Sequence, residues 1–368
     1  MKSIIYVLFG VIISSLMACA QNKNNTNLAY THQVIVSGLK NPWGFVFLPD
    51  NAMLITEKSG SLIHFKNGKK TTIAGLPDIA VYGQGGLMDI ALHPNYKNNG
   101  WIYFTYASSQ GDTNGVNTAL ARAQLKNSTL VNLEILYKAT PNVDAGQHFG
   151  SRIVIDTNNY VYFSIGDRGN RDLFPQDLTT DGGKIYRLHD DGSIPKNNPF
   201  YNTLNAKKAI YSFGHRNPQG MAIHPETGEI WSHEHGPKGG DEINIIKAGK
   251  NYGWPKVTFG KNYSGTPITN QTQAPGMRAP IHYWTPSIAP SGMAFVTSSK
   301  YPDWTGNVLV GSLKFQYLNN CFLDGEKLIK EEQLLNGLGR IRSVVQGPDG
   351  YLYVGVENLG IVKIVSKS

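Results

Sequence analysis

Short runs of aromatic and β-branched residues recur along the chain, and each follows a polar turn. A Pro or polar turn leads to Asn, Asp or Gly and then to a strand-like run. The six instances read FLPDNAMLIT, LHPNYKNNGWIYFTY, IDTNNYVYFSIG, IHPETGEIWSHE, KYPDWTGNVLVGS and QGPDGYLYVGV. Anchored on Pro49, Pro94, Thr157, Pro225, Pro302 and Pro348, they are separated by 45, 63, 68, 77 and 46 residues. The pattern predicts units of a few strands joined by loops of variable length.

The repeat favours one architecture. Repeated four-stranded blades around an axis give this signature, and six anchors predict an all-β fold, a six-bladed β-propeller over residues 31–368. No long stretch has the 3.6-residue periodicity that an α/β fold would need. The strand-like runs 32–36 and 360–365 are expected to share one blade and close the ring. We expect no second domain, and a site on the loop face near the axis.

The N-terminus has the pattern of an export signal. Lys2 supplies a positive start, residues 4–17 are largely apolar, and the sequence LMAC ends at Cys19. The apolar run is short for a membrane span, and small residues before a cysteine are typical of a bacterial lipoprotein signal. We therefore expect a signal peptide over 1–18, acylation of Cys19 and a polar tether over 19–30. The protein is then exported to the periplasmic side and lipid-anchored; the alternative is an ordinary signal peptide that contains a cysteine.

Charge and cysteine content narrow the functional classes. The 368 residues carry a net charge of +8, and the basic residues are scattered, with no run longer than two. This indicates a mildly basic soluble surface and does not favour nucleic-acid binding. After lipidation of Cys19, Cys321 is the remaining thiol, so we expect no intrachain disulfide and a buried structural role for Cys321.

The richest candidate chemistry lies in residues 211–255, YSFGHRNPQGMAIHPETGEIWSHEHGPKGGDEINIIKAGKNYGWP. An Arg-Asn pair, a Gly-Pro turn and an acidic pair surround one strand-like run: Arg216-Asn217, Gly236-Pro237 and Asp241-Glu242. Arginine, bare carbonyls and carboxylates together suit an anionic ligand bridged by a hard cation. The segment therefore predicts a cofactor site.

Three further segments carry polar residues in turns. YGQGGLMDIALHP holds Gln84, AGQHFGSR holds His148, and GSLKF with GLGRIRS bring Lys314, Arg340 and Arg342. Corresponding loops of a propeller open on one face, so these side chains and Arg216 are expected to form a positive mouth for a multiply charged anion. Taken singly, each has a plainer explanation. A loop histidine is often a surface hydrogen-bonding residue, Arg-x-Arg can form surface ion pairs, and Asp241-Glu242 can be a solvated turn.

From about Leu39 to the C-terminus the chain resembles the soluble sugar dehydrogenases that depend on pyrroloquinoline quinone (PQQ), and most closely their aldose dehydrogenase branch. The resemblance rests on NPWGFVFLPD, GQGGLMDIALHP, GQHFGSR, IGDRG, GHRNPQGMA, EHGPKGGDEIN, GKNYGWP and GRIRS. The fold of that family is a six-bladed propeller, in agreement with the repeat.

The resemblance implies roles for individual residues. His148 matches the general base that takes the proton of the anomeric hydroxyl. Arg216 and Asn217 match residues that hold the quinone, with Arg216 near its reactive carbonyl. The residues that match those gripping its carboxylates and ring are Gln84, Lys314, Arg340 and Arg342.

Two calcium sites are implied in the same way. Gly236 and Pro237 match backbone carbonyls on a calcium that bridges to PQQ. Glu242 and Tyr252, the latter through its main-chain oxygen, match ligands of a second, structural calcium away from the chemistry. The implied reaction is hydride transfer from C1 of an aldose to PQQ, giving a lactone and PQQH₂. His148 must be neutral for this, and cationic surroundings are expected to lower its pKa.

Two positions bear on the substrate. Gln147 stands where the glucose-specific branch has an Asp before the base, which argues against tight glucose specificity. Trp284, in HYWTPSIAPSG, is either an apolar platform for a sugar ring or a blade-core residue.

Other readings stay open at this point. A calcium-dependent lactonase would place carboxylates and Asn at the mouth instead of Arg and Lys, and a non-catalytic glycan-binding propeller would retain a relic site. A dehydrogenase needs an external electron acceptor, and either a monomer or a homodimer fits the sequence.

Overall fold

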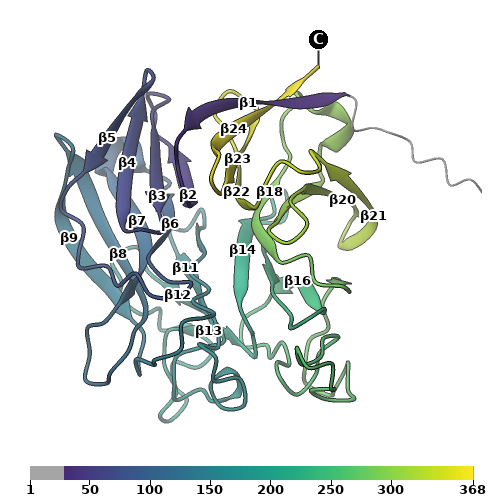
Figure 1. Cartoon of the computed structure of the whole chain (residues 1–368). Coiled ribbons are helices and arrows are strands. Elements are labelled where there is room, and N and C mark those ends of the chain that lie inside the picture. The colour runs from purple at the N-terminus through teal and green to yellow at the C-terminus, as the bar shows by residue number, and fades with distance from the viewer. Residues whose placement is uncertain (1–28, 368) are drawn as a thin grey trace, which may run out of the picture.

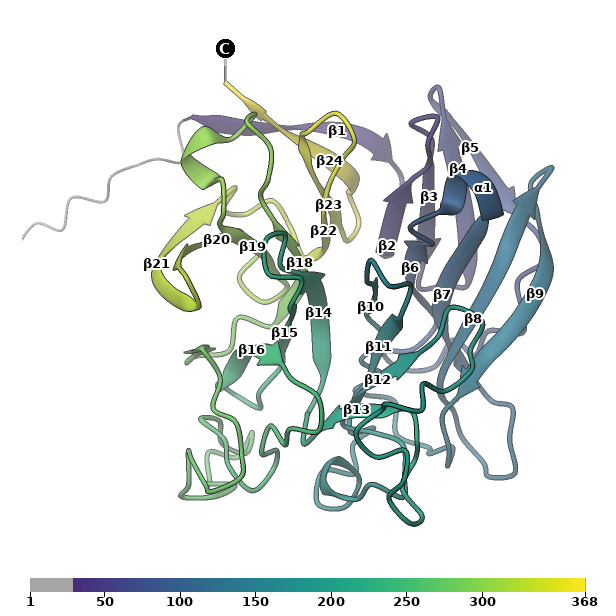
Figure 2. The ribbon, with the colours of Figure 1, turned by 180° about the vertical axis from the view of Figure 1, so that it is seen from behind.

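The computed structural model describes residues 29–367, and these form six four-stranded antiparallel sheets arranged around an axis (Figures 1 and 2). The expected all-β, six-bladed β-propeller is confirmed. The signal peptide 1–18, Cys19 and most of the tether lie outside the described residues. Among those described, no helix combines the length and apolar character needed to cross a membrane.

The blades follow the chain, each beginning with its innermost strand. Blade one is β2 (Pro42–Phe47), β3 (Met53–Glu57), β4 (Ser61–Lys66) and β5 (Lys69–Ile73); blade two is β6 (Leu87–Leu92), β7 (Trp101–Ser108), β8 (Asn117–Lys126) and β9 (Thr129–Lys138). Blade three is β10 (Ile153–Ile155), β11 (Val161–Ile165), β12 (Lys184–Leu188) and β13 (Ile210–Phe213); blade four is β14 (Pro218–Ile223), β15 (Ile230–Glu234), β16 (Asp241–Ile246) and β17 (His282–Trp284). Blade five is β18 (Pro290–Phe295), β19 (Val308–Ser312), β20 (Leu318–Asp324) and β21 (Lys327–Leu334). The helical elements described are single turns: α1 (Tyr96–Asn99), η2 (Phe174–Gln176) and η3 (Pro302–Trp304).

The sixth blade closes the ring with both ends of the chain. Its inner strands are β22 (Ile341–Gln346), β23 (Leu352–Val356) and β24 (Gly360–Ser366), and β1 (Tyr30–Ser37) pairs antiparallel with β24 at the outer edge. The prediction that 32–36 and 360–365 share a blade is confirmed. Backbone hydrogen bonds between the two ends of the chain therefore hold the first and last blades together.

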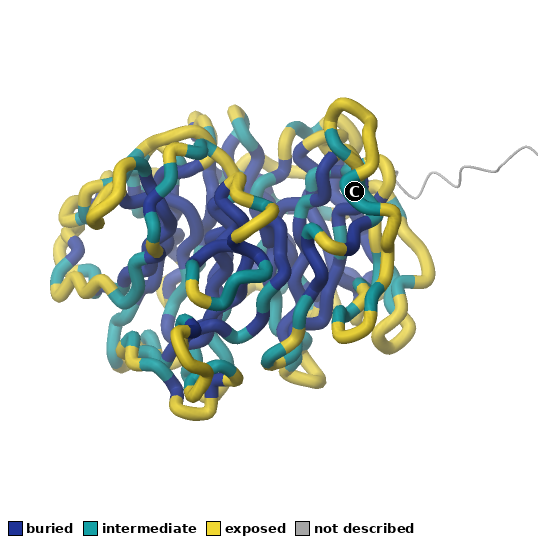
Figure 3. Tube along the Cα trace, turned by 90° about the horizontal axis from the view of Figure 1, so that it is seen from below, coloured by how far each residue is buried: buried dark blue, intermediate teal, exposed yellow. Residues whose placement is uncertain are grey.

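The apolar runs of the repeat form the core between blades. One cluster joins blades one and two through residues such as Leu54 and Phe104, and another joins blades five and six through Leu309 and Val354. Figure 3 shows this as buried backbone in the interior and exposed backbone in the outer loops. Cys321 is fully buried in such a cluster, as expected.

All six repeat motifs occupy the same place, the turn from the first to the second strand of a blade. In an antiparallel blade this turn lies on the face opposite to the loops that enter the first strand. Gln84, Asn217 and Arg340 lie in entering loops, just before β6, β14 and β22. The repeat therefore marks the face opposite to the candidate site.

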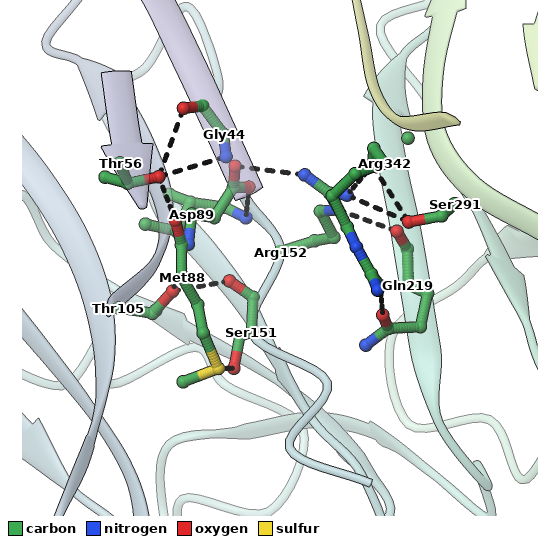
Figure 4. Close-up of polar contacts among 12 residues, drawn as sticks. Gly44, Thr56, Met88, Asp89, Thr105, Ser151, Arg152, Gln219, Ser291 and Arg342 are labelled. Carbon is green, nitrogen blue, oxygen red and sulfur yellow. Dashed lines mark hydrogen bonds and ion pairs between the residues drawn. The ribbon is translucent and has the colours of Figure 1, made fainter. Parts of the chain in front are cut away.

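The axis is closed by one buried arginine, Arg152, which directly precedes β10 (Figure 4). Its guanidinium contacts one residue from each of the other five inner strands: Trp43, Asp89, Gln219, Ser291 and Arg342. The Nη1–Oδ1 distance to Asp89 is 3.1 Å, Nε donates to the Gln219 carbonyl at 2.6 Å, and the guanidinium lies 4.1 Å from the Trp43 ring centroid. Arg152 therefore bonds the six blades to one another at the centre.

Candidate active site

The loops that enter the inner strands surround a cavity of about 360 Å³ next to the axis. Four of the residues expected to hold the cofactor line it, and they come from blades two, four and six: Gln84, Asn217, Arg340 and Arg342. Lys58 and Trp43 line the same cavity and were not singled out from the sequence. Segments far apart in the chain thus meet at one cationic cavity, as the positive-mouth hypothesis requires.

His148 lies in a turn beside this cavity, and its imidazole is held by a carboxylate. Its Nδ1 is 2.6 Å from Oδ1 of Asp167, and its backbone N–H donates to Oε1 of Gln84 at 2.9 Å. Asp167 is 1% exposed and also accepts hydrogen bonds from Trp254 Nε1 at 2.8 Å and from the Gly169 N–H at 2.8 Å. An ionised Asp167 can only accept, so His148 carries its proton on Nδ1 and leaves Nε2 free to take another.

Burial and charge set the protonation of this pair. Burial lowers the pKa of His148, the hydrogen bond to Asp167 raises it, and the nearby Arg216 charge lowers it, with a net lowering. Burial raises the pKa of Asp167, but its bond to His148 and the charges of His148 and Arg216 outweigh this and lower the pKa overall. The expected direction for His148 is therefore observed, with burial as the larger cause. A neutral imidazole beside an ionised carboxylate is the form that a general base needs.

Arg216 and Asn217 form the turn that backs this pair. The Arg216 carbonyl accepts the N–H of Asp167 at 2.7 Å, and its Nη1 donates to the His235 carbonyl at 3.0 Å. Asn217 is buried, and its Oδ1 accepts the N–H of Gly150 at 3.0 Å. Arg216-Asn217 is thus bonded both to Asp167, the partner of the His148 imidazole, and to Gly150, two residues after His148.

Arg340 and Arg342 share a carboxylate that sequence reasoning missed. Nε of Arg340 donates to Glu357 Oε2 at 2.7 Å, and Nη2 of Arg342 donates to Oε1 at 2.7 Å. Burial raises the pKa of Glu357, yet the charge of Arg342 and the bonds from both arginines lower it overall. Lys314 is exposed on the neighbouring loop, with Nζ 4.9 Å from the Phe315 ring centroid. The two arginines are therefore held in place before any anion arrives.

The residues expected to bind calcium surround a narrow pocket beside the cavity. Gly236, Glu242 and Tyr252 all line it together with Arg216, so residues expected at both calcium sites border one pocket. Pro237 belongs to the same loop, and its carbonyl accepts the Lys261 N–H at 3.1 Å, which leaves a second lone pair.

A buried carboxyl group and a half-buried one meet at this pocket. Glu234 on β15 and Glu242 on β16 are direct cross-strand partners, and burial followed by the Glu234 charge raises the pKa of Glu242 well above its usual range. Asn244 Nδ2 donates to both, at 3.3 and 3.2 Å, while its Oδ1 is buried without a partner. Within residues 29–367 no three His, Cys, Asp or Glu side chains form a metal cluster, so main-chain oxygens would complete any coordination. The donor set is all oxygen, which fits Ca²⁺.

Asp241, which had no assigned role, braces the Gly-Pro turn. Its Oδ1 accepts the Gly236 N–H at 2.8 Å, and its Oδ2 accepts the Ser287 hydroxyl at 2.8 Å and the Ala289 N–H at 2.9 Å. Asp241 therefore connects the loop of blade four to the start of blade five.

The two substrate predictions have different outcomes. Trp284 is buried in the cluster of Trp231 and Val308, and its Nε1 donates to Glu331 Oε2 at 2.6 Å. The structure therefore favours the blade-core alternative for Trp284, because the indole is covered at the blade edge. Gln147 is exposed beside His148, and its role in specificity stays a prediction.

Comparison with known proteins shows the family of the chain. The model of the family described as Glucose / Sorbosone dehydrogenase matches residues 39–363. The chain is 41% identical over 330 residues to the aldose sugar dehydrogenase YliI of Escherichia coli (strain K12), covering 88% of each chain.

Two solved structures share the fold over nearly the whole chain. The apo-form of the soluble aldose sugar dehydrogenase from E. coli has a TM-score of 0.89 at 38% identity, covering 92% of this chain and 100% of that one. The PQQ-bound form of the aldose sugar dehydrogenase from Streptomyces coelicolor has a TM-score of 0.74 at 26% identity, covering 92% and 99%. By sequence, fold and family model alike, the chain belongs to the glucose/sorbosone dehydrogenase family.

Proposed function

We propose that the protein oxidises aldose sugars at C1 to lactones, using PQQ and Ca²⁺, with His148 as the general base. The observation that carries the proposal is the 2.6 Å pair of His148 and Asp167 beside a cavity lined by Lys58, Arg340 and Arg342. The E. coli relative is named an aldose sugar dehydrogenase, and the S. coelicolor relative was solved with PQQ bound.

The residues fit both groups. PQQ carries three carboxylates, and Lys58, Arg340 and Arg342 are cations at the cavity wall that can neutralise and orient them. Burial and then the charge of the facing Glu234 disfavour the ionised form of Glu242, and a divalent cation bound beside the pair would favour it. When bound, PQQ supplies the carbon that accepts the hydride, and Ca²⁺ polarises the adjoining carbonyl.

The protein's own task is to move one proton. As the C1–H bond of the sugar is lost with its electron pair, Nε2 of His148 takes the proton of the C1 hydroxyl, and the C1–O bond becomes a carbonyl. Asp167 stabilises the imidazolium that forms, since its carboxylate accepts the Nδ1–H throughout. Arg216, whose carbonyl accepts the Asp167 N–H, would stabilise negative charge that develops on the oxidant.

The cavity argues against the lactonase alternative. That reading expects carboxylates and Asn at the mouth instead of Arg and Lys. Asn41 and Asn217 do line the cavity, but three cations line it as well, and its one acidic residue, Glu357, is paired to two of them. Cofactor-free protein is therefore expected to leave lactones intact.

The proposal is tested with purified protein, PQQ and Ca²⁺. An absorbance titration with PQQ is followed by addition of aldoses, with dye reduction as the readout. Turnover is expected with several aldoses and abolished by chelation; absence of turnover with every sugar and simple alcohol would overturn the proposal.

A variant tests the assigned base. We expect His148→Ala to bind PQQ like the wild type but to lose about 10²- to 10⁴-fold in kcat, the range for a missing general base. His32→Ala, on the exposed edge strand β1, is the control and should keep wild-type kcat. Intact turnover in His148→Ala would show that another group takes the proton.

A further inference from the structure

A second arginine of the site face is buried behind the His148 loop instead of lining the cavity. Arg168 directly follows Asp167, is completely buried, and has a left-handed backbone with φ of +52°. Neither the predicted anion-binding set nor the pocket beside Glu242 includes it. Its charge therefore needs another explanation.

The guanidinium of Arg168 donates hydrogen bonds to backbone carbonyls around His148. Nη1 donates to the Gln147 carbonyl, and Nη2 donates to the Ala145 carbonyl at 2.7 Å and the Val116 carbonyl at 3.3 Å. The guanidinium carbon, Cζ, lies 3.5 Å from the centroid of the Phe149 ring. Two of these contacts, with Gln147 and Phe149, fall immediately before and immediately after His148 in the chain.

Burying the charged guanidinium of Arg168 costs free energy, and its hydrogen bonds to the loop offset that cost. The groups that Arg168 contacts are neutral, its Nε is buried without a partner, and burial lowers its pKa to about 9. A methionine would fill similar space without the cost of burying a charge. What the arginine adds is a set of hydrogen bonds that only a forked donor can make.

The His148 loop needs such support. His148 itself has a φ of +58°, which is unfavourable for a residue with a side chain. The loop also packs tightly against Gly166, where an added Cβ would lie 2.2 Å from the His148 carbonyl oxygen. The absence of a side chain at Gly166 therefore lets the two backbone segments approach, but it does not hold the His148 loop in place. Without Arg168, the strained turn would lose the donors that hold its preceding carbonyls.

We propose that Arg168 is a positioning residue for His148, acting on the backbone of the loop while its neighbour Asp167 acts on the imidazole. The proposal rests on the proposed function in that His148 is taken as the base. Asp167 then holds the imidazole of His148, and Arg168, the next residue in the same turn, holds the backbone of the His148 loop. Geometry of this accuracy is what proton transfer demands, because a displacement of about 1 Å can cost about 100-fold in rate.

The test compares Arg168→Met and Arg168→Lys with a matched control, Arg187→Met. Arg187 is also a buried arginine of blade three, bonded to Asn197 and Asn198 at 2.7 Å, and it has no contact with the His148 loop. The first readout needs no cofactor. It is the NMR resonance of the His148 Nδ1–H proton, which is hydrogen-bonded to Asp167, in histidine-labelled apoprotein. The resonance is assigned by its absence in His148→Ala.

That resonance should be present in the wild type and in Arg187→Met, and lost or shifted in Arg168→Met. Arg168→Lys keeps the charge but has one donor centre, so we expect a partial effect; it also carries the test if Arg168→Met does not fold. An unchanged resonance in both Arg168 variants, or an equal change in Arg187→Met, would overturn the proposal.

The second readout is kinetic. Arg168→Met should lose about 10- to 100-fold in kcat while PQQ affinity and KM for the sugar change by less than about three-fold, the signature of a displaced base. A loss of PQQ affinity as large as the loss of kcat would indicate general collapse and refute a positioning role. If the wild type itself shows no PQQ-dependent turnover, the proposed function fails, and the NMR comparison still decides the role of Arg168.

Discussion

Replacing Arg152 with methionine removes a side chain whose guanidinium contacts the inner strands of the five other blades. Met keeps the apolar stem but leaves Asp89 buried without its counter-charge and the Gln219 carbonyl without its donor. The Arg342 carbonyl keeps a hydrogen bond from Ser291 Oγ at 2.8 Å, so its loss is smaller. The dominant cost is therefore the uncompensated carboxylate.

The magnitude follows from that carboxylate. Removing one partner of a buried ion pair costs about 3–5 kcal/mol because the other charge stays buried and unpaired. With an unfolding entropy of about 2.1 cal/mol/K per residue, a domain of this length loses about 1.4 °C of Tm per kcal/mol, so Tm should fall by about 4–7 °C.

The loss should also depend on pH. Burial raises the pKa of Asp89, and the Arg152 charge restrains that rise. In Arg152→Met the pKa of Asp89 rises further, so the native state holds a proton that the unfolded chain releases. Stability that depends on this proton is complete at low pH and is lost as pH rises through the folded pKa. The deficit of Arg152→Met should therefore be larger at pH 8 than at pH 5.

Calorimetry or denaturant unfolding at both pH values measures this deficit. Lys66→Met, which breaks the half-exposed pair with Asp50, is the control and should change stability by less than about 1 kcal/mol. Adding Asp89→Asn to Arg152→Met should recover part of the loss, because no buried charge then remains. A Tm within about 2 °C of wild type, or a double variant as unstable as the sum of the singles, would refute the reasoning.

Three further predictions concern the site and its surroundings. Asp167→Asn should lower kcat by at least about 100-fold without weakening PQQ binding, because an amide cannot stabilise the imidazolium of His148; steady-state kinetics with wild-type kcat would contradict this. Glu242→Gln should raise the Tm of calcium-free protein by relieving carboxylate repulsion and abolish the Tm increase caused by Ca²⁺; thermal unfolding with and without chelator checks it, and an equal Ca²⁺ response in both proteins would count against the site. Burial lowers the pKa of His233 to about 3, so the unfolded chain binds a proton below pH 6.5 that the native state refuses, and stability falls as pH falls. His233→Gln should make the pH 7 to 4 stability curve shallower by up to about 1.4 kcal/mol per pH unit, and parallel curves in urea unfolding would exclude this origin.

The sequence identified the site residues that lie in distinctive motifs. It did not identify the carboxylates that hold those residues in place. His148, Arg216 and Arg342 are polar residues in loops of distinctive composition, and polar loop residues are where function concentrates. Asp167 lies within the IGDRG motif, but the sequence did not indicate that it pairs with His148. The two residues are 19 positions apart and meet only because β10 and β11 pair in blade three. Glu357 follows β23 in a segment with no motif at all.

The sequence left two interpretations of Trp284 open for a related reason. Its neighbours in the chain are polar and Pro-rich, which suits a binding loop as well as a strand end. Only the position of β17 at the outer edge of blade four, with Glu331 of the next blade at hydrogen-bond distance, shows that the indole is a structural residue.

The sequence alone determined the class of fold, the number of blades and the closure of the ring. These follow from local signals, the alternation of polar turns and strand-like runs, because each blade is a meander whose strands pair with their neighbours in the chain. The tertiary structure decided the contacts at the axis and in the site. Arg152 meets Ser291 and Arg342 across 139 and 190 residues, and such pairs form only when six blades of unequal length close into one ring. Local pattern fixes each blade, but the geometry of closure selects which loop residues face one another.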